Sequence, residues 1–158
     1  MVKILIVYFS QTGNTEDMAK AVEQGALAEG AVVERKRVED VSVDRLTDFD
    51  GVIIGSPTYF GTMAADIKRF VDESIKHFRK LDGKVGGAFS SCGGTGGGGE
   101  TTILDILKAL LIHGMVVQGT SEGGHYGPMS IGKPKAVTRA ECEALGQRVA
   151  RLAKRMSP

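Results

Sequence analysis

The sequence predicts an α/β protein in which one parallel sheet is covered by helices on both faces. Short apolar runs alternate with helical patterns, which is typical of strands joined by helical crossovers. The runs at 4–9, 51–56 and 85–90 are almost continuously apolar, as expected for strands buried on both faces. With right-handed crossovers, we expect a three-layer sandwich whose five-stranded parallel sheet has the order 2-1-3-4-5.

Composition and charge indicate one globular domain over residues 1–158. Hydrophobic residues make up 42% of the chain, charged residues make up 25%, and the net charge is +1. This balance argues against a nucleic-acid partner. No apolar run has the length of a membrane span or the form of a signal peptide. Cys92 and Cys142 lie far apart without metal-ligand spacing, so we expect free thiols, no metal site and a cytoplasmic protein.

The elements of the first half follow from spacing and from chain breakers. Helical spacing of apolar residues follows the first strand up to Gly30, which suits a helix stop. Residues 31–38 are β-prone but highly charged, and this suits the edge position that the order gives to the second strand. Residues 41–49 predict at most a turn of helix. The third strand ends in a breaker-rich loop at 57–61, and a long helix is expected from Met63 to Phe78.

The second half repeats the alternation. A glycine-rich stretch at 91–99 separates the fourth strand from a helix at 103–111. A short last strand is expected at 115–117, and a long loop over 118–135 follows it. A final helix begins near Thr138. Its predicted buried stripe is Cys142, Leu145, Val149, Leu152 and Met156.

The first strand breaks abruptly into a hydroxyl-rich loop, Ser10–Thr15, which opens a helix. The N-terminus of a helix offers unpaired backbone N–H groups and a positive dipole end, so it suits a phosphate. The hydroxyls of Ser10, Thr12 and Thr15 can add donors. The loop contains no Lys or Arg, so dipoles and hydrogen bonds would hold the phosphate. A turn followed by a helix cap is the alternative interpretation.

Three segments together resemble known flavoproteins. Ser10–Thr15 is similar to the phosphate loop of the flavodoxin-like proteins, Ser/Thr-x-Thr-Gly-x-Thr. Gly55–Ala64, GSPTYFGTMA, resembles a segment of the WrbA-like NAD(P)H:quinone oxidoreductases, and so does Gly83–Ser91 followed by Gly96–Thr102. Leu110–Val117 matches their fourth helix and fifth strand. The chain is therefore identified as a short variant of this family, with a flavodoxin-like fold.

The resemblance implies an FMN protein, usually homo-oligomeric as a homodimer or homotetramer, that passes electrons from NAD(P)H to quinones. The first loop would bind the FMN phosphate, the second would follow the ribityl chain and the ring edge, and the third would approach the pyrimidine side of the ring. The flavin N5 would carry the chemistry, with no catalytic side chain. The residues implied are Ser10, Gln11, Thr12, Gly13, Asn14, Thr15, Pro57, Thr58, Tyr59, Phe60, Gly61, Ser90, Ser91, Cys92, Gly93, Gly94, Thr95 and Gly96.

Two histidines outside the three segments, His113 and His125, bear on the resemblance. The family often carries paired histidines before the Gly-Met of its fifth strand, whereas this chain has Ile112-His113. His113 is equally explained as a cation at a helix C-terminus with Gly114 as the stop. His125 and Tyr126 lie on the last long loop and are candidates for the substrate side of the ring. A solvent-exposed pair is the alternative for them.

Two functions of different classes fit this resemblance. One is an enzyme that takes hydride from NAD(P)H at the flavin and then reduces a quinone or a similar acceptor. The other is a flavodoxin-type electron carrier that docks on a redox protein. Flavodoxins are usually strongly acidic, whereas this chain is nearly neutral. The third loop also lacks the aromatic residue that would cover one ring face. Both features favour the enzyme.

Overall fold

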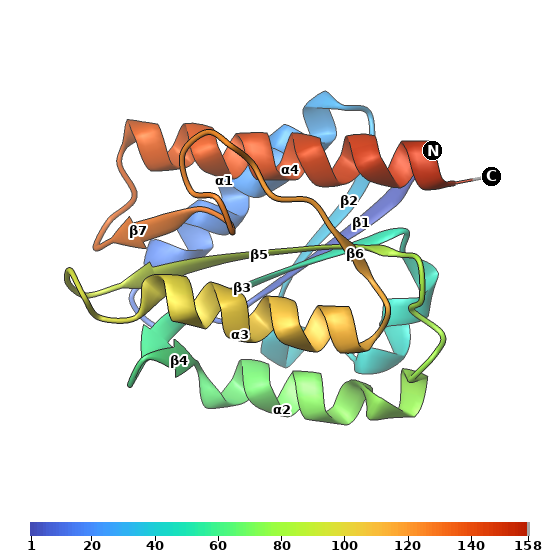
Figure 1. Ribbon diagram of the computed structural model, residues 1–158, viewed down its shortest axis with the longest axis horizontal. Helices are drawn as coiled ribbons and strands as arrows, with labels where there is room; N and C mark the ends of the chain where they lie inside the picture. The colour runs from blue at the N-terminus through green and yellow to red at the C-terminus, as the bar shows by residue number, and fades with distance from the viewer. Residues whose placement is uncertain (158) are drawn as a thin grey trace.

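The computed structural model describes residues 1–157, and helices and strands alternate along it (Figure 1). The strands are β1 (Lys3–Tyr8), β2 (Val32–Arg37), β3 (Gly51–Tyr59), β4 (Thr62–Met63), β5 (Val85–Cys92), β6 (Val116–Val117) and β7 (Met129–Ile131). The α-helices are α1 (Asn14–Ala28), α2 (Ala65–Glu73), α3 (Gly99–Ile112) and α4 (Ala136–Met156). Short 3₁₀ helices are η1 (Val38–Asp40), η2 (Val43–Asp48) and η3 (Ser74–His77).

The sheet has the strand positions that the sequence predicts. Its order is β2-β1-β3-β5-β6, with parallel pairing between all neighbours. The charged strand β2 lies at one edge, as expected. The expectation of five strands is wrong in detail. β7 also pairs in parallel with β5, at Ser90–Cys92, and β4 forms an antiparallel hairpin with β3.

The last strand position is therefore shared by β6 and β7. β6 pairs with the start of β5 and β7 with its end, while residues 118–128 leave the sheet between them. The expectation of an uninterrupted loop over 118–135 is wrong at Met129–Ile131. A strand of three residues is too short to show an apolar period in the sequence. Its pairing with β5 comes from the tertiary fold.

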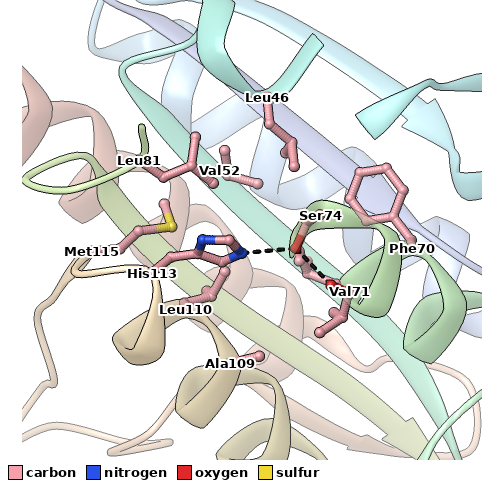
Figure 2. A pocket seen from close by; sticks show the side chains of 11 residues that line it. Leu46, Val52, Phe70, Val71, Ser74, Leu81, Ala109, Leu110, His113 and Met115 are labelled. Carbon is pink, nitrogen blue, oxygen red and sulfur yellow. Dashed lines mark hydrogen bonds between the residues drawn. The ribbon is translucent and has the colours of Figure 1, made fainter. Parts of the chain in front are cut away.

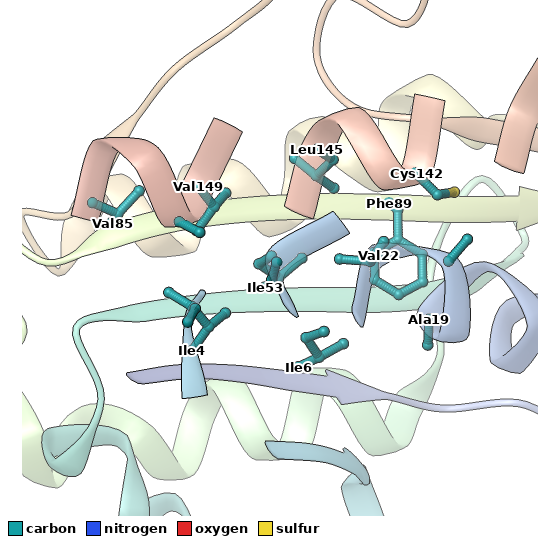
Figure 3. Close-up of a cluster of buried hydrophobic side chains, with 14 of the residues drawn as sticks. Ile4, Ile6, Ala19, Val22, Ile53, Val85, Phe89, Cys142, Leu145 and Val149 are labelled. Atoms are coloured by element: carbon teal, nitrogen blue, oxygen red, sulfur yellow. The ribbon is translucent and has the colours of Figure 1, made fainter. Parts of the chain in front are cut away.

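Two apolar cores lie on opposite faces of the sheet. Ile4 and Ile6 belong to the core under α1 and α4, whereas Leu5 and Val7 belong to the core under α2 and α3. Figure 3 shows the first core, in which Phe89 is fully buried between the sheet and the helices. The expectation that the apolar runs have both faces buried is confirmed, because consecutive residues of a strand point to opposite faces.

Helices α1 and α4 cross at very close range (Figure 1). The contact is made by Gly25 on α1 and Gly146 on α4. A Cβ on Gly25 would collide with the backbone carbonyl of Glu143, and a Cβ on Gly146 with that of Val22.

The predicted stripe of α4 includes Cys142, a free thiol at this interface, and burial raises the pKa of this thiol to about 12. Met156, also predicted in the stripe, is instead 43% exposed.

The segment after β4 differs from the expected long helix. Met63 belongs to β4, and α2 ends at Glu73, where the chain tightens into η3. The hydroxyl of Ser74 donates to the carbonyl oxygen of Val71 at 2.6 Å. This bond competes with helical pairing at that point, as serine hydroxyls commonly do.

His113 lies at the C-terminal end of α3 and faces this bend (Figure 2). Its Nε2 atom is 2.7 Å from the hydroxyl oxygen of Ser74. Because the single Ser74 proton is used on Val71, the histidine donates through Nε2. Within residues 1–157, the buried Nδ1 of His113 has no hydrogen-bond partner. It borders a cavity of about 20 Å³ lined mainly by apolar side chains.

The cationic interpretation of His113 is therefore wrong, although Gly114 does end the helix with φ +78°. Burial, and next the neighbouring His77, lower the pKa of His113 below its ordinary value. A charged imidazole would be poorly solvated in this apolar surrounding. The folded protein therefore favours the neutral form.

We predict that Gly25→Ala destabilises the protein. In an uncrowded helix interior, this change would stabilise by about 0.5–1 kcal/mol. Here the added methyl group meets backbone atoms of α4, which cannot rotate away, so we expect a loss of about 2 kcal/mol in the free energy of unfolding. Denaturant titration measures this change in the free energy of unfolding. Gly93→Ala is the control, because no atom lies within 4 Å of that Cβ position. A Gly25→Ala variant as stable as the parent would contradict the close contact between α1 and α4.

We also predict that His113 contributes to the dependence of stability on pH. Its pKa is lower in the folded chain than its ordinary value of 6.5. The stability it contributes is therefore fully present above pH 6.5 and is lost as the pH falls toward the folded pKa. In His113→Gln, the decline in the free energy of unfolding between neutral and mildly acidic pH should be shallower. His125→Gln should keep the parental slope. Equal slopes in all three proteins would disprove the effect.

Candidate functional site

Three predicted loop segments meet at one edge of the sheet. Because β1, β3 and β5 are parallel neighbours, their carboxyl ends lie together. Buried hydroxyl groups connect the segments. The Thr15 hydroxyl is 2.9 Å from that of Ser91, and the Thr58 hydroxyl is 3.0 Å from that of Ser90. The hydroxyl of Thr102 on α3 is 3.0 Å from that of Thr58. The sequence segments 10–15, 57–61 and 90–96 therefore form one surface.

The first loop is organised by Ser10. Its buried hydroxyl oxygen accepts the N–H groups of Gly13 at 3.1 Å and of Glu16 at 3.3 Å. Gly13 has φ +100° and open space where a Cβ would lie. The N–H groups of Asn14 and Thr15 begin α1 and have no partner one turn earlier in the helix. These backbone donors lie at the helix end where the sequence predicts an anion.

The three hydroxyl groups of this loop have different roles. Ser10 caps the loop and Thr15 bonds to Ser91, so both are engaged within the protein. Thr12 is exposed, as is Gln11, whose side-chain oxygen accepts the Tyr59 hydroxyl at 2.9 Å. The N-cap of α1 is Gly13, which has no side chain to cap the helix, so the alternative interpretation is met only in part. The Ser10 hydroxyl, outside the helix, accepts the Glu16 N–H and leaves those of Asn14 and Thr15 available.

Arg37 is a cation near this loop that sequence reasoning missed. It ends β2 directly beside Tyr8, the last residue of β1. Its Nη2 donates to the carbonyl oxygen of Ser10. The loop itself contains no Lys or Arg, but the sheet brings one to it. The available signal was the strand order, since the second strand lies beside the first and ends at the same edge.

The second segment is a hairpin, and the expectation of a loop over 57–61 is wrong. β3 continues through Pro57 and Thr58 to Tyr59, which pairs with Thr62 of β4. The two-residue turn between them is Phe60-Gly61, with φ values of 51° and 81°. Positive φ at both positions is typical of the turn that matches strand twist, and a bulky residue at the first of them is unusual.

The hairpin is fixed to the rest of the site. Thr101 at the start of α3 donates to the carbonyl oxygen of Gly61 at 2.7 Å, and Thr62 donates to Asp105 at 2.7 Å. The ring of Tyr59 meets that of Phe9 edge-on, with centroids 6.4 Å apart. The side chain of Phe60, by contrast, is fully exposed. The fold therefore holds an aromatic side chain in solvent on a strained but well-anchored turn.

The third segment divides into strand and turn. Ser90, Ser91 and Cys92 belong to β5, and only the residues after them form the glycine-rich turn. In that turn the Gly97 N–H donates to the carbonyl oxygen of Gly94 at 3.1 Å, so the stretch is a structured turn rather than a linker. It approaches the tip of the hairpin, since a Cβ on Gly98 would crowd Gly61.

The turn offers open space along its length. A Cβ on any of Gly93, Gly94 and Gly96 would meet no atom within 4 Å, and Thr95 is exposed. The Cys92 thiol instead packs beside Met129, with the two sulfur atoms 3.7 Å apart. A cavity of about 280 Å³ lies between this turn and β7. A flat group could approach this backbone closely, because no side chain of the turn's glycines blocks it.

His125 and Tyr126 are not brought to these loops by any described contact. His125 Nδ1 is 2.9 Å from the carbonyl oxygen of Thr120, within the same loop, and Tyr126 is exposed. Gly127 touches the middle of β5 at Ala88, before the carboxyl end. The loop tip lies against α4, where it borders a cavity of about 380 Å³ that Arg148 also lines. A substrate role for the pair stays a prediction.

The chemistry of the site is that of binding. In the segments 10–15, 56–61 and 90–98, Tyr59 and Cys92 are the only titratable side chains. Among residues 1–157, no group of three His, Cys, Asp or Glu side chains is placed to hold a metal ion. No helix in this range is long and apolar enough to cross a membrane. Free N–H groups at one end and exposed aromatic and glycine surfaces at the other suit a flat group with an anionic tail.

Comparisons with known proteins agree with this geometry. An Archaeoglobus fulgidus protein named NAD(P)H dehydrogenase (quinone) is 35% identical over 190 residues, covering 99% of this chain and all of that one. A protein named flavodoxin from Aquifex aeolicus is 37% identical and covers 95% of this chain and 86% of its own. A solved structure from Agrobacterium tumefaciens, described as a flavodoxin, WrbA-like protein, superposes with a TM-score of 0.83 at 26% identity over 99% of this chain and 100% of that one. Residues 5–103 match the flavodoxin domain family, and the chain therefore belongs to this family.

Proposed function

We propose that this protein is an FMN-dependent oxidoreductase that passes electrons from NAD(P)H to a quinone or a similar small acceptor. The observation that carries the proposal is the surface formed by the three segments, which combines free helix N–H groups with an open glycine turn. The name of the Archaeoglobus fulgidus relative, NAD(P)H dehydrogenase (quinone), supports the reaction class.

The residues present fit FMN. The first turn of α1, with the N–H groups of Asn14 and Thr15, would hold the phosphate. Thr58 and Tyr59 would follow the ribityl chain and the ring edge. The backbone from Ser91 to Gly96 would lie along the pyrimidine side, where its open glycine positions leave room. When bound, FMN supplies the hydride and electron chemistry, and the protein supplies binding and orientation.

The protein groups near the ring would act through hydrogen bonds and access. Backbone N–H groups on the glycine turn stabilise negative charge on a neighbouring group, by the same electrostatic logic as an oxyanion hole. The turn has no aromatic side chain, so one ring face would stay open to a second molecule. Nicotinamide and acceptor would use that face in turn. No side chain acts as a general base in this scheme.

A flavodoxin-type electron carrier is the second candidate, favoured by the Aquifex aeolicus relative named flavodoxin. A carrier would dock on a redox protein and would not itself oxidise NAD(P)H. Carriers of this kind use a strong charge to steer docking. The net charge of +1 favours the enzyme.

The setting of the activity is part of the same proposal. We expect a homodimer or homotetramer in the cytoplasm, with no nucleic acid or membrane partner. The two thiols, Cys92 and Cys142, are free and buried, as suits a reducing compartment.

The decisive experiment mixes FMN-loaded protein anaerobically with NADH or NADPH. We expect one of them to bleach the oxidised flavin absorbance faster than it bleaches free FMN, and benzoquinone to restore the absorbance. Flavin that neither nicotinamide reduces would contradict the enzyme and leave the carrier. Protein that retains no FMN through gel filtration would contradict both.

A variant of Phe60 tests whether its strained position serves the cofactor. Asn adopts positive φ more readily than Phe, so Phe60→Asn should raise the free energy of unfolding by about 1 kcal/mol. The same variant should weaken FMN binding, measured by calorimetry. Phe78→Asn is the matched control, because Phe78 is 46% exposed and has φ −53°. Phe78→Asn should neither raise the free energy of unfolding nor weaken FMN binding. A Phe60→Asn protein that is less stable, or that binds FMN as the parent does, would contradict the assignment.

A further inference from the structure

We infer that Arg37 selects a phosphorylated flavin by placing its guanidinium beside the phosphate-binding loop. The inference rests on the proposed function and deepens it. It assigns to β2, outside the three segments, the residue that distinguishes FMN from riboflavin. The two flavins share the ring and the ribityl chain, so a group that distinguishes them must act on the phosphate.

The position of Arg37 is fixed from two sides. Its Nη2 donates to the carbonyl oxygen of Ser10, the first residue of the loop. Its guanidinium carbon lies 5.8 Å from the centroid of the Tyr8 ring, within cation–π range. Tyr8 is 2% exposed and belongs to the core, so it offers a rigid support. The cation is thereby held at the carboxyl end of the sheet, next to the N-terminus of α1.

Arg37 also keeps most of its donors. A guanidinium carries five N–H groups, and among the described residues the hydrogen bond to Ser10 is the one that Arg37 makes. The carboxylates of Glu16 and Glu39 lie 3.9 Å and 3.6 Å away, which is beyond hydrogen-bond distance. Such loose, partly exposed ion pairs contribute little and yield readily to a stronger anion.

Arg35, two residues earlier on the same strand, provides the contrast. It also lies over the Tyr8 ring, at 5.9 Å. Its Nε donates to Glu23 at 2.7 Å, and both side chains of this pair are less than a quarter exposed. Arg35 is therefore committed to a structural ion pair. Of the two arginines over Tyr8, Arg37 is therefore the one whose guanidinium is not held in a close ion pair.

The negative charges around the phosphate-binding loop favour a cation at this position. The first turn of α1 already carries Glu16 and Asp17. A phosphate monoester brings a charge between about −1.5 and −2 at neutral pH, so it would meet two carboxylates as well as the helix dipole. Lys20 is paired with Asp17 at 3.4 Å and is largely exposed. The Arg37 guanidinium offsets this repulsion, and it can exchange Glu39 for the phosphate.

The test compares FMN with riboflavin by calorimetric titration of apo-protein. Arg37→Gln should weaken FMN binding by roughly ten-fold, the effect of losing one charge-assisted hydrogen bond, and should change riboflavin binding less than about two-fold. Arg37→Lys should recover part of the loss. Arg35→Gln is the matched control and should keep the parental ratio of the two affinities. Glu39→Gln should tighten FMN binding, a gain that a merely unfolded variant cannot give.

Salt gives an independent readout. The parental preference for FMN over riboflavin should fall as ionic strength rises, and that of Arg37→Gln should fall less. Equal losses of FMN and riboflavin affinity in Arg37→Gln would mean that Arg37 only supports the Ser10 carbonyl, and would overturn the inference alone. A parent protein that binds neither flavin would overturn the proposed function, and this inference with it.

Discussion

Parallel pairing of β1, β3 and β5 is the constraint on which the site depends. Parallel neighbours end at the same edge, so the residues that follow each strand must share one surface. Ser10, Thr58 and Ser91 are far apart in the sequence, and the register of the sheet places them there together. The helices on both faces make this register hard to change, because a shift by one residue would turn each buried side chain to the wrong core.

Buried hydroxyl groups convert this proximity into a rigid surface. Thr15, Ser90, Ser91 and Thr102 are all within 5% exposure, and each has a hydroxyl partner from another segment. A buried hydroxyl without a partner is costly, so each of these bonds opposes separation of the segments it joins. The N–H groups that remain free at the start of α1 are thus positioned before any ligand binds, which lowers the ordering cost of binding.

The sequence predicts the framework better than its details. The continuous apolar runs predicted the buried strands, because a strand buried on two faces needs apolar residues at every position. Their alternation with helices, together with right-handed crossovers, predicted the strand order, and the charged second strand suited its edge position. The hairpin at Tyr59–Thr62 was missed because Pro57 and Gly61 usually break strands, and nothing local indicates that Phe60 adopts positive φ. The neutral state of His113 depends on Ser74 and on burial, both of which are tertiary. Arg37 was missed because its contact with Ser10 joins two strand ends, and only the sheet order relates them.

The distribution of charge separates two tasks that a flavin site must perform. The segments nearest the expected ring contain no carboxylate, ammonium or guanidinium group, so the ring would meet backbone dipoles and apolar surfaces. The charged groups Glu16, Arg37 and Glu39 gather at the other end, around the N-terminus of α1. A charge beside the ring would alter the energy of its reduced form, whereas a charge at the phosphate is screened over the intervening distance. In the proposed binding mode, a cation at Arg37 would therefore strengthen recognition of the tail without disturbing the chemistry at the ring.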